Sequence, residues 1–218
     1  MISQRKIYHT FNFTFNNELI NGNYTELDKL LDLIIQSKIF FSWGGNFLIN
    51  RDLKKEFFDK MVKAGCNNLT IGIESGSEKI RKDMQKNSTN KLLKQQIKFM
   101  HKAGIDVRLQ IIIGYPTETE EEFKKTLRFI YDVKEYIESV RFGYTCMLAI
   151  GSPLTVNAKK IGIKFDNNGD WYYKDNTFKV RQKRLAIANQ KGLQWRIVRK
   201  SDYFDKAIGK SKGKQIEL

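Results

Sequence analysis

The alternation of apolar and amphipathic segments along most of the chain constrains the fold more than any other feature. Strands are expected at Ile7–Phe15, Ile39–Trp43, Asn68–Glu74, Asp106–Ile113 and Ser139–Leu148. Between them, apolar residues at helical spacing predict helices at Tyr24–Ser37, Asp52–Lys63 and Glu118–Lys134. Repeated strand–helix units of this kind form a parallel sheet with helices packed outside it.

About five such units are present, fewer than the eight that close a full barrel. The sequence therefore predicts an α/β fold: an incomplete TIM-type βα barrel of about five parallel strands, with helices outside, over residues 1–165. A polar loop with four aromatic residues spans Ile163–Thr177. It leads into a basic segment, Lys179–Lys200, in which apolar residues recur at helical spacing. Residues 166–218 are therefore expected to form a loop and a basic helical tail.

Charge and cysteine content argue against several classes of function. The 218 residues carry a formal net charge of +15, but lysines are spread over the whole chain, so a solvated surface is preferred to a nucleic-acid stripe. No apolar run approaches the roughly 18 residues of a membrane helix, and the N-terminus lacks a signal-peptide core, so a cytoplasmic protein is expected. Cys66 and Cys146 form no CxxC or Cys/His cluster, which argues against a disulfide framework or a zinc site.

Polar residues gather where two predicted strands end. The apolar run Leu69–Ile73 ends in Glu74, and ligands of parallel α/β folds sit at that edge of the sheet. On the strand Asp106–Ile113, Arg108 and Gln110 alternate with apolar residues, so they need a partner or a ligand. A capping role for Glu74, and pairing of Arg108 and Gln110 with neighbouring strands, remain alternatives. The residues alone predict a ligand-binding α/β barrel.

Five segments together resemble the radical S-adenosylmethionine (SAM) superfamily, and especially the C-terminal part of the radical SAM core in its cobalamin-binding-type branch. They are FNFTFNNELINGN (Phe11–Asn23), FSWGGNF (Phe41–Phe47), KAGCNNLTIGIESGSEKIRKDMQK (Lys63–Lys86), KAGIDVRLQIIIGYPTETEEEF (Lys102–Phe123), and GSPL with AKKIGI (Gly151–Leu154, Ala158–Ile163). The resemblance covers roughly residues 8–165. In such enzymes the cofactor lies across the C-terminal ends of the strands of a six-stranded partial barrel.

The resemblance implies a role for each residue at this edge. Glu74 would bind the ribose or amino acid part of SAM, Lys86 would face its carboxylate, and Gln110 would reach the ribose hydroxyls. The backbone from Ile112 through Ile113 to Gly114 would flank the adenine. The implied cofactor-binding residues are Glu74, Ser75, Lys86, Gln110, Ile112, Gly114, Tyr115 and Pro116. No catalytic or metal-binding residue is implied within the chain.

One family motif is absent, the CxxxCxxC sequence whose three cysteines hold the four-iron four-sulfur cluster. Cys66 and Cys146 do not replace it, so a cluster is expected only if an N-terminal segment or a partner subunit supplies the cysteines. Cobalamin is a further candidate cofactor of the complete form. The chain is thus expected to be a fragment or subunit that contributes the SAM-binding strands, inactive in radical chemistry by itself. Complete, it would generate a 5′-deoxyadenosyl radical that abstracts hydrogen from a substrate.

Three alternatives without catalysis stay open from the sequence. The chain could be a basic RNA-binding module, an interaction subunit with an open sheet edge near Ile7–Phe15, or a decayed remnant. Nucleic acid is a possible partner but is not favoured, because no RNA-binding motif is present, and no membrane partner is expected.

Overall fold

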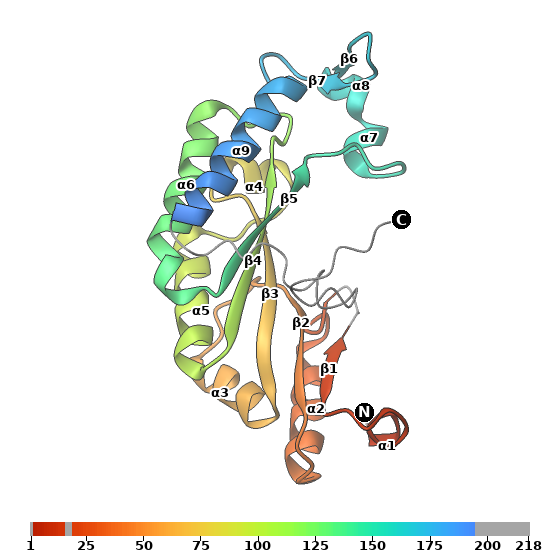
Figure 1. The fold of residues 1–218 in the computed structure, drawn as a ribbon, viewed down its shortest axis with the longest axis vertical. Coiled ribbons are helices and arrows are strands. Elements are labelled where there is room, and N and C mark those ends of the chain that lie inside the picture. Colours follow the sequence, from red (N-terminus) through yellow and green to blue (C-terminus); the bar gives the residue numbers. More distant parts are fainter. Residues whose placement is uncertain (1, 16–18, 195–218) are drawn as a thin grey trace, which may run out of the picture.

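The computed structural model describes residues 2–15 and 19–194, and its centre is one parallel sheet. The strands are β1 (Asn12–Phe15), β2 (Ser42–Phe47), β3 (Cys66–Glu74), β4 (Asp106–Ile113) and β5 (Ser139–Thr145). They lie side by side in chain order, and each is parallel to the next (Figure 1). The predicted α/β fold, an incomplete barrel of five parallel strands, is confirmed.

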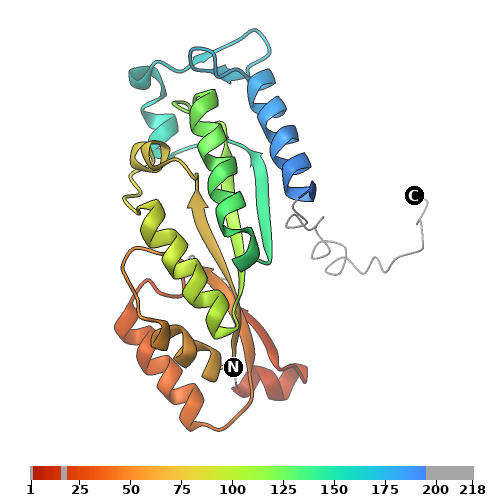
Figure 2. The same ribbon diagram turned by 90° about the vertical axis from the view of Figure 1, so that its left-hand side faces the viewer.

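Most helices form a single layer against this sheet. The helices are α1 (Ile2–Tyr8), α2 (Tyr24–Gln36), α3 (Lys55–Lys63), α4 (Glu78–Asp83), α5 (Asn90–Ala103), α6 (Glu120–Val133), α7 (Pro153–Val156), α8 (Ala158–Ile161) and α9 (Phe178–Gln194). Figure 2 looks onto the layer made by α2, α3, α5, α6 and α9. We call the face of the sheet turned away from this layer the inner face. No helix within the described ranges is long and apolar enough to cross a membrane.

The hydrophobic core lies between the sheet and the helix layer. On β4, the side chains of Val107, Leu109 and Ile111 are buried, whereas Arg108 and Gln110 are only half-buried. This is the predicted alternation, and burial of each large aliphatic side chain contributes roughly 1.5–3 kcal/mol to folding. The apolar positions fix the strand's orientation, and they leave its polar side chains on the inner face.

Helix ends follow the expected capping rules. Gly104 ends α5 in the left-handed conformation, at φ 95°, which only glycine adopts without strain. Thr119 caps α6 by accepting a hydrogen bond from the backbone N–H of Glu122. The cap places the first helical residue at Glu120, two residues after the predicted start at Glu118. Glu118 is therefore not helical, and it is buried.

The structure differs from the predicted elements in several places, including the last strand, which ends at Thr145 and not at Leu148. Ile7 belongs to helix α1, so the expected strand Ile7–Phe15 shrinks to its last four residues. The second strand, expected at Ile39–Trp43, begins at Ser42 and extends through Gly44 and Gly45 to Phe47. A β-carbon on Gly44 would lie 2.4 Å from the Asn68 side chain, so this side chain fills the space beside the glycine. The loop after Ile163 contains a short antiparallel hairpin, β6 (Lys164–Phe165) with β7 (Trp171–Tyr172). Residues 195–200 of the predicted basic helix lie outside the described ranges.

The strand register breaks near the carboxyl ends of two strand pairs. Between β3 and β4 it shifts at Gly72 to Glu74, and between β4 and β5 it shifts at Ile111 to Ile113. Such bulges increase local twist and redirect side chains. Glu74 also adopts a left-handed backbone conformation, at φ 61°, which is uncommon for a residue with a side chain. The end of β3 is therefore specially shaped where it presents the Glu74 carboxylate.

Candidate functional site

The candidate site lies on the inner face at the carboxyl edge of the sheet, the upper edge in Figure 1. β3 contributes Gly72 and Glu74 on alternate positions, and β4 contributes Gln110 and Ile112. The register pairs Gly72 with Gln110, and Gln110 with Arg141 of β5. Three neighbouring strands thus place polar groups side by side near this edge.

Glu74 and Lys86 form an ion pair at this edge. Lys86 Nζ lies 2.6 Å from Glu74 Oε1, with the two side chains 37% and 18% exposed. A β-carbon on Gly72 would lie 2.8 Å from that same oxygen, so the glycine leaves room for the carboxylate. A partly exposed pair of this kind contributes little to stability, about 0–1 kcal/mol. Its value lies in holding one positive and one negative group where a zwitterionic ligand could exchange partners with them.

Gln110 has unused hydrogen-bonding capacity. Within the described ranges neither Gln110 nor Arg108 makes a side-chain hydrogen bond or ion pair, and Arg141 likewise has none. The alternative in which Arg108 and Gln110 pair with neighbouring strands is therefore wrong for the residues described. A side-chain amide supplies both donors and an acceptor, which suits the hydroxyls of a sugar.

Ser75 lies on the other side of the sheet edge. It is fully buried, and its hydroxyl lies 3.0 Å from the Thr126 hydroxyl of α6. The backbone N–H of Ser77 also donates to the Ser75 hydroxyl, at 3.1 Å. These contacts bind the turn to the helix layer, so the structure does not bring Ser75 together with Glu74 and Gln110 on the inner face. Ser77 caps α4, the helix that leads to Lys86.

The turn after β4 is held by residues from elsewhere in the chain. Gly114 has φ 82°, a left-handed value that favours glycine. Tyr115 donates its hydroxyl to the backbone oxygen of Asp83 at 3.1 Å, which ties the turn to the end of α4. Asn176 donates its side-chain amide to the carbonyls of Gly114, Tyr115 and Pro116, at 3.3, 2.8 and 3.2 Å. We call Gly114–Pro116 the cofactor turn, after the role that the sequence predicts for it.

Ile112 packs into a second, smaller apolar cluster above the sheet. Its buried members are Cys146, Ala158, Ile163 and Trp171. The predicted residues Tyr115 and Ile112 both border this cluster, so the hairpin β6–β7 and helix α8 support the cofactor turn from the far end. The turn is therefore anchored on several sides.

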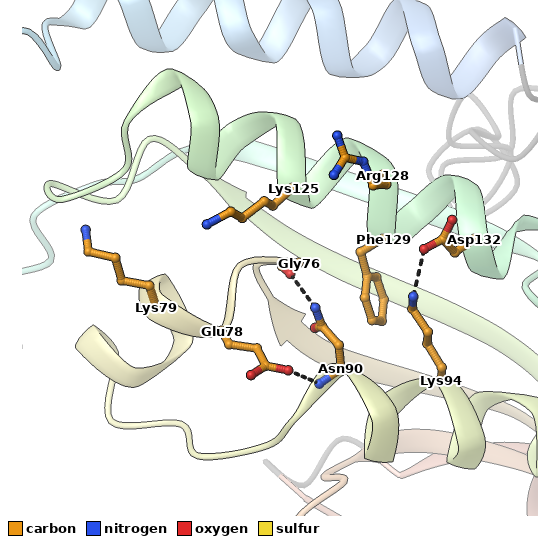
Figure 3. A pocket seen from close by; sticks show the side chains of 9 residues that line it. All are labelled: Gly76, Glu78, Lys79, Asn90, Lys94, Lys125, Arg128, Phe129 and Asp132. Carbon is orange, nitrogen blue, oxygen red and sulfur yellow. Dashed lines mark hydrogen bonds and ion pairs between the residues drawn. The ribbon is translucent and has the colours of Figure 1, made fainter.

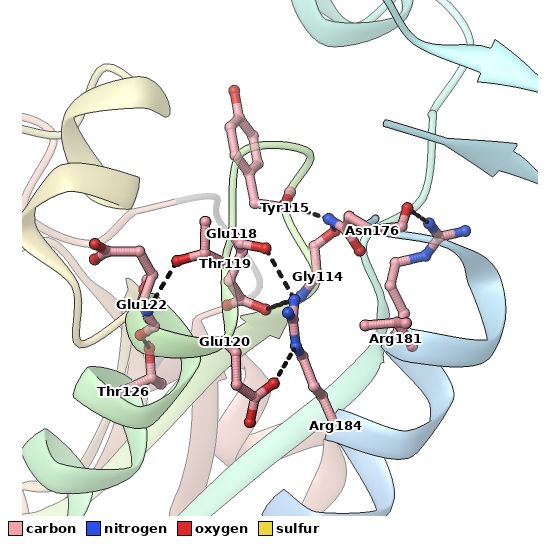
Figure 4. Close-up of polar contacts among 12 residues, drawn as sticks. Gly114, Tyr115, Glu118, Thr119, Glu120, Glu122, Thr126, Asn176, Arg181 and Arg184 are labelled. Atoms are coloured by element: carbon pink, nitrogen blue, oxygen red, sulfur yellow. Dashed lines mark hydrogen bonds and ion pairs between the residues drawn. The ribbon is translucent and has the colours of Figure 1, made fainter. Parts of the chain in front are cut away.

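Sequence reasoning missed the charged residues behind the cofactor turn. Figure 4 shows Glu118 beside Gly114, with Arg184 of α9 reaching both its carboxylate and its backbone oxygen. Burial raises the pKa of Glu118 to about 7, although the nearby positive charge of Arg184 opposes this shift. The sequence did contain a signal for them. Arg181, Arg184 and Ala188 recur at helical spacing, so they lie on one face of α9, and all three are buried. Arginines that occupy an apolar stripe need buried partners.

The two cysteines do not fit an iron–sulfur cluster. Cys66 and Cys146 are both buried free thiols, and burial raises the pKa of each to about 12. Cluster ligands are thiolates, so these protonated side chains are poorly suited to bind iron. Among the described residues, no group of three or more His, Cys, Asp or Glu side chains could hold a metal ion.

A separate polar cleft of about 350 Å³ lies on the helix side (Figure 3). Its lining residues are Gly76, Glu78, Lys79, Asn90, Lys94, Lys125, Arg128, Phe129 and Asp132. Several of its polar groups already hold α5 to neighbouring elements: Asn90 donates to the Gly76 carbonyl, and Lys94 pairs with Asp132 at 2.7 Å. The cleft belongs to the packing of the helix layer and does not include any residue of the predicted site.

Curated proteins similar to this chain include several tRNA-modifying enzymes. A tRNA-2-methylthio-N(6)-dimethylallyladenosine synthase of Desulfitobacterium hafniense is 26% identical over 195 residues, which cover 84% of this chain and 40% of that protein. The threonylcarbamoyladenosine tRNA methylthiotransferase MtaB of Bacillus subtilis is 38% identical over 78 residues, 35% of this chain and 16% of that protein. The chain thus spans less than half the length of these relatives.

Solved structures show the same fold. The radical SAM methyltransferase TsrM of Kitasatospora setae, with tryptophan and a SAM analogue, matches 86% of this chain and 44% of its own length, with a TM-score of 0.67 and 11% identity. The cobalamin-dependent radical enzyme OxsB matches 77% of this chain and 31% of its own length, with a TM-score of 0.62 and 16% identity. The family model described as "Radical SAM superfamily" matches residues 3–130, more than half of the chain. With this match and the predicted barrel in place, the chain belongs to the radical SAM superfamily.

Proposed function

We propose that this chain supplies the SAM-binding strands of a radical SAM enzyme. The observation that carries the proposal is the convergence of Glu74, Lys86 and Gln110 with the cofactor turn at one edge of the inner face. Each residue comes from a different part of the chain, and each side chain is at least partly exposed. Such convergence of charged and polar groups at the carboxyl edge of parallel strands is typical of a ligand site.

The chemistry of these side chains fits the groups of SAM. The Lys86 ammonium suits its carboxylate, the Glu74 carboxylate suits its ammonium or ribose hydroxyls, and the Gln110 amide suits the ribose hydroxyls. The cofactor turn, with Gly114 in its left-handed conformation, offers backbone groups beside the adenine. Bound SAM supplies the radical chemistry, whereas the residues of this chain bind and orient it.

We further propose that the cluster-binding cysteines come from an N-terminal segment or a partner subunit. The chain contains only two cysteines, and both are buried. Among the described strands, β1 pairs only with β2, so its other edge is open to one more parallel strand. A bare edge of this kind invites pairing with another chain segment. A segment that adds one strand here and carries the three cysteines after it would complete six strands and supply the cluster ligands.

The substrate of the complete enzyme is a second proposal, and nucleic acid is the class that the present observations support best. The relatives from Desulfitobacterium hafniense and Bacillus subtilis carry names of tRNA-modifying enzymes. Arg108 and Arg141 place two cations without described partners on the inner face. This substrate class predicts an RNA affinity that falls with salt, by about 0.7 log units per phosphate contacted for each log unit of salt on a single strand. Affinity for RNA that does not change with salt would count against it.

The proposed SAM site is tested by equilibrium dialysis of radiolabelled SAM against the complete enzyme, with this chain as wild type or variant. Gln110→Ala and Lys86→Met are expected to raise the Kd by roughly tenfold each, since each removes one polar or charge-assisted contact. Lys79→Met is the matched control, because Lys79 is an exposed lysine in the cleft on the helix side. An unchanged Kd in both site variants would refute the assignment.

Cluster supply is tested on the chain alone. Anaerobic reconstitution with iron and sulfide is expected to give no stoichiometric four-iron cluster, because two buried thiols cannot provide three thiolates. Addition of the completing segment or subunit is expected to restore one, and absorption and electron paramagnetic resonance spectra report both results. A stoichiometric cluster on the chain alone would contradict this proposal. Cobalamin, bound in OxsB, is tested in the same complete form by its visible spectrum.

A further inference from the structure

The cofactor turn is gripped by residues that lie about sixty positions later in the sequence. Asn176, Arg181 and Arg184 come from helix α9 and the segment before it, and Glu118 joins them from the loop before α6 (Figure 4). We call these four residues the α9 clasp. All three residues of the later segment lie beyond residue 130, where the match to the family model ends.

The first part of the clasp is a buried ion pair. Arg184 Nη1 lies 2.9 Å from the backbone oxygen of Glu118 and 3.3 Å from its Oε2 atom, while Arg184 Nε reaches Glu120 at 3.2 Å. Glu118 Oε2 also accepts a hydrogen bond from the backbone N–H of Gly114, at 2.9 Å. The side chains of Arg184 and Glu118 are 7% and 0% exposed, so water screens this pair little. Arg184 therefore fixes the carboxylate that fixes the first residue of the cofactor turn.

The second part is a direct contact between Arg181 and Gly114. A β-carbon on Gly114 would lie 2.5 Å from Arg181 Cγ and Cδ, so the arginine fills the space beside the glycine. The guanidinium stacks 3.6 Å from the centre of the Trp171 ring and donates to the carbonyls of Asn176 and Trp171, at 3.0 and 2.8 Å. Arg181 therefore occupies the space that a side chain at position 114 would need.

The third part is the amide of Asn176, which contacts all three carbonyls of the cofactor turn. Asn176 is itself buried, and Arg181 holds its backbone oxygen, so its side chain is fixed in place. Figure 4 shows the ring of Tyr115 pointing away from Asn176 and Arg184, which leaves that ring to its contact with Asp83. The backbone carbonyls of the turn are therefore held by the segment before α9, in addition to the contact that Tyr115 itself makes.

We infer that Asn176 and Arg184 are positioning residues for SAM: through the α9 clasp they hold the cofactor turn in the conformation that receives the adenine. This inference rests on the proposed function for its ligand, but the clasp itself is a property of the chain without ligand. A turn that is held before binding costs less conformational entropy when the ligand arrives. Loosening the clasp is therefore expected to weaken SAM binding even though no clasp side chain is predicted to touch SAM.

Hydrogen exchange of the ligand-free chain tests the clasp directly. Arg184→Met is expected to speed exchange of the Gly114 amide by roughly tenfold, because it removes the guanidinium group that holds the Glu118 carboxyl group against that amide. Asn176→Ala is the second variant; it keeps the ion pair and removes only the contacts with the turn carbonyls. Lys183→Met is the matched control, since it removes one exposed cation from the neighbouring position of the same helix. Circular dichroism establishes that each variant is folded.

The affinity of the complete enzyme for SAM then tests the positioning role. Arg184→Met and Asn176→Ala are each expected to raise the Kd roughly tenfold, with Lys183→Met unchanged. Unchanged exchange at Gly114 in folded variants would overturn the clasp, whatever the affinity of the wild type. Faster exchange with an unchanged Kd would overturn the positioning role. A wild-type enzyme that binds no SAM would instead overturn the proposed function, so the two failures are distinguishable.

Discussion

Replacement of Glu118 by glutamine should change how the stability of the fold depends on pH. Glu118 is 2% exposed, and burial raises its pKa to about 7 from the ordinary value of 4.5. Burial is the largest influence on this pKa, and the Glu120 charge raises it further. Arg184 and the hydrogen bond from Gly114 lower the pKa, but by less than burial raises it. Glu118→Gln keeps an acceptor for the Gly114 N–H and removes the titration. The variant therefore isolates the cost of carrying a charge at this position.

The sign follows from linkage. The folded chain holds the Glu118 proton more tightly than the unfolded chain, so this residue's contribution to stability is complete below pH 4.5 and is lost as the pH rises through 7. The shift of about 2.5 pKa units corresponds to about 3 kcal/mol. The free energy of unfolding of Glu118→Gln, minus that of the wild type, should therefore increase by about 3 kcal/mol between pH 4.5 and pH 8.

Urea unfolding at several pH values, followed by tryptophan fluorescence, measures this difference. Glu56→Gln serves as the control, because Glu56 is an exposed glutamate of α3. A difference that stays constant for Glu118→Gln from pH 4.5 to 8 would refute the reasoning. It would mean that Arg184 offsets the burial of the carboxylate completely.

Three further predictions concern packing and reactivity. Gly76→Ala should destabilise the fold by roughly 1–3 kcal/mol, because the new β-carbon would lie 2.6 Å from the backbone of α6. Gly143→Ala is the control, since a β-carbon there meets nothing within 4 Å. Urea unfolding of both variants measures the difference, and equal unfolding midpoints would contradict the prediction. Trp43→Phe should lower the free energy of unfolding by about 1–3 kcal/mol in the same assay, because it removes the 2.7 Å hydrogen bond from the buried indole N–H to the Ala64 carbonyl. An unfolding midpoint equal to that of the wild type would contradict this prediction. Cys66 and Cys146 should react with a thiol reagent at pH 8 only after unfolding, because both thiols are buried and burial raises the pKa of each to about 12. Rapid labelling of the native chain would contradict this prediction.

The parts of the fold that sequence predicted best are those fixed by local pattern. Asp106–Ile113 was predicted to the residue, because its alternation is regular and Gly104 stops the helix before it. The strand at the sheet edge was poorly predicted. Ile7 is an exposed residue of helix α1, and alternation of apolar residues alone did not distinguish this short helix from a strand. Propensity is a weak guide where little is buried, so the edge of the sheet was the least predictable part.

The candidate site shows the same division. Glu74 and Gln110 could be placed together because parallel strands end at one edge. Ser75 could not be separated from them, since its orientation is set by a bulge and a contact with α6 that no local pattern encodes. The grip of Arg181 and Arg184 on the cofactor turn depends on tertiary contacts across about sixty residues, and only their spacing on α9 hints at it.

The two bulges at the carboxyl edge also bear on how this sheet can diverge in sequence. Up to Gly72 on β3 and Ile111 on β4, side chains alternate strictly between the core and the inner face. An inserted residue there would move every side chain on one side of it to the opposite face. Beyond those points the register is reset, so an insertion or exchange at the edge does not shift the buried residues before it. Ile73 and Ile113 remain buried in the core beyond these points, so variation at this edge is confined to the alternate positions such as Glu74 and Ile112, where a new ligand preference could arise without a new fold.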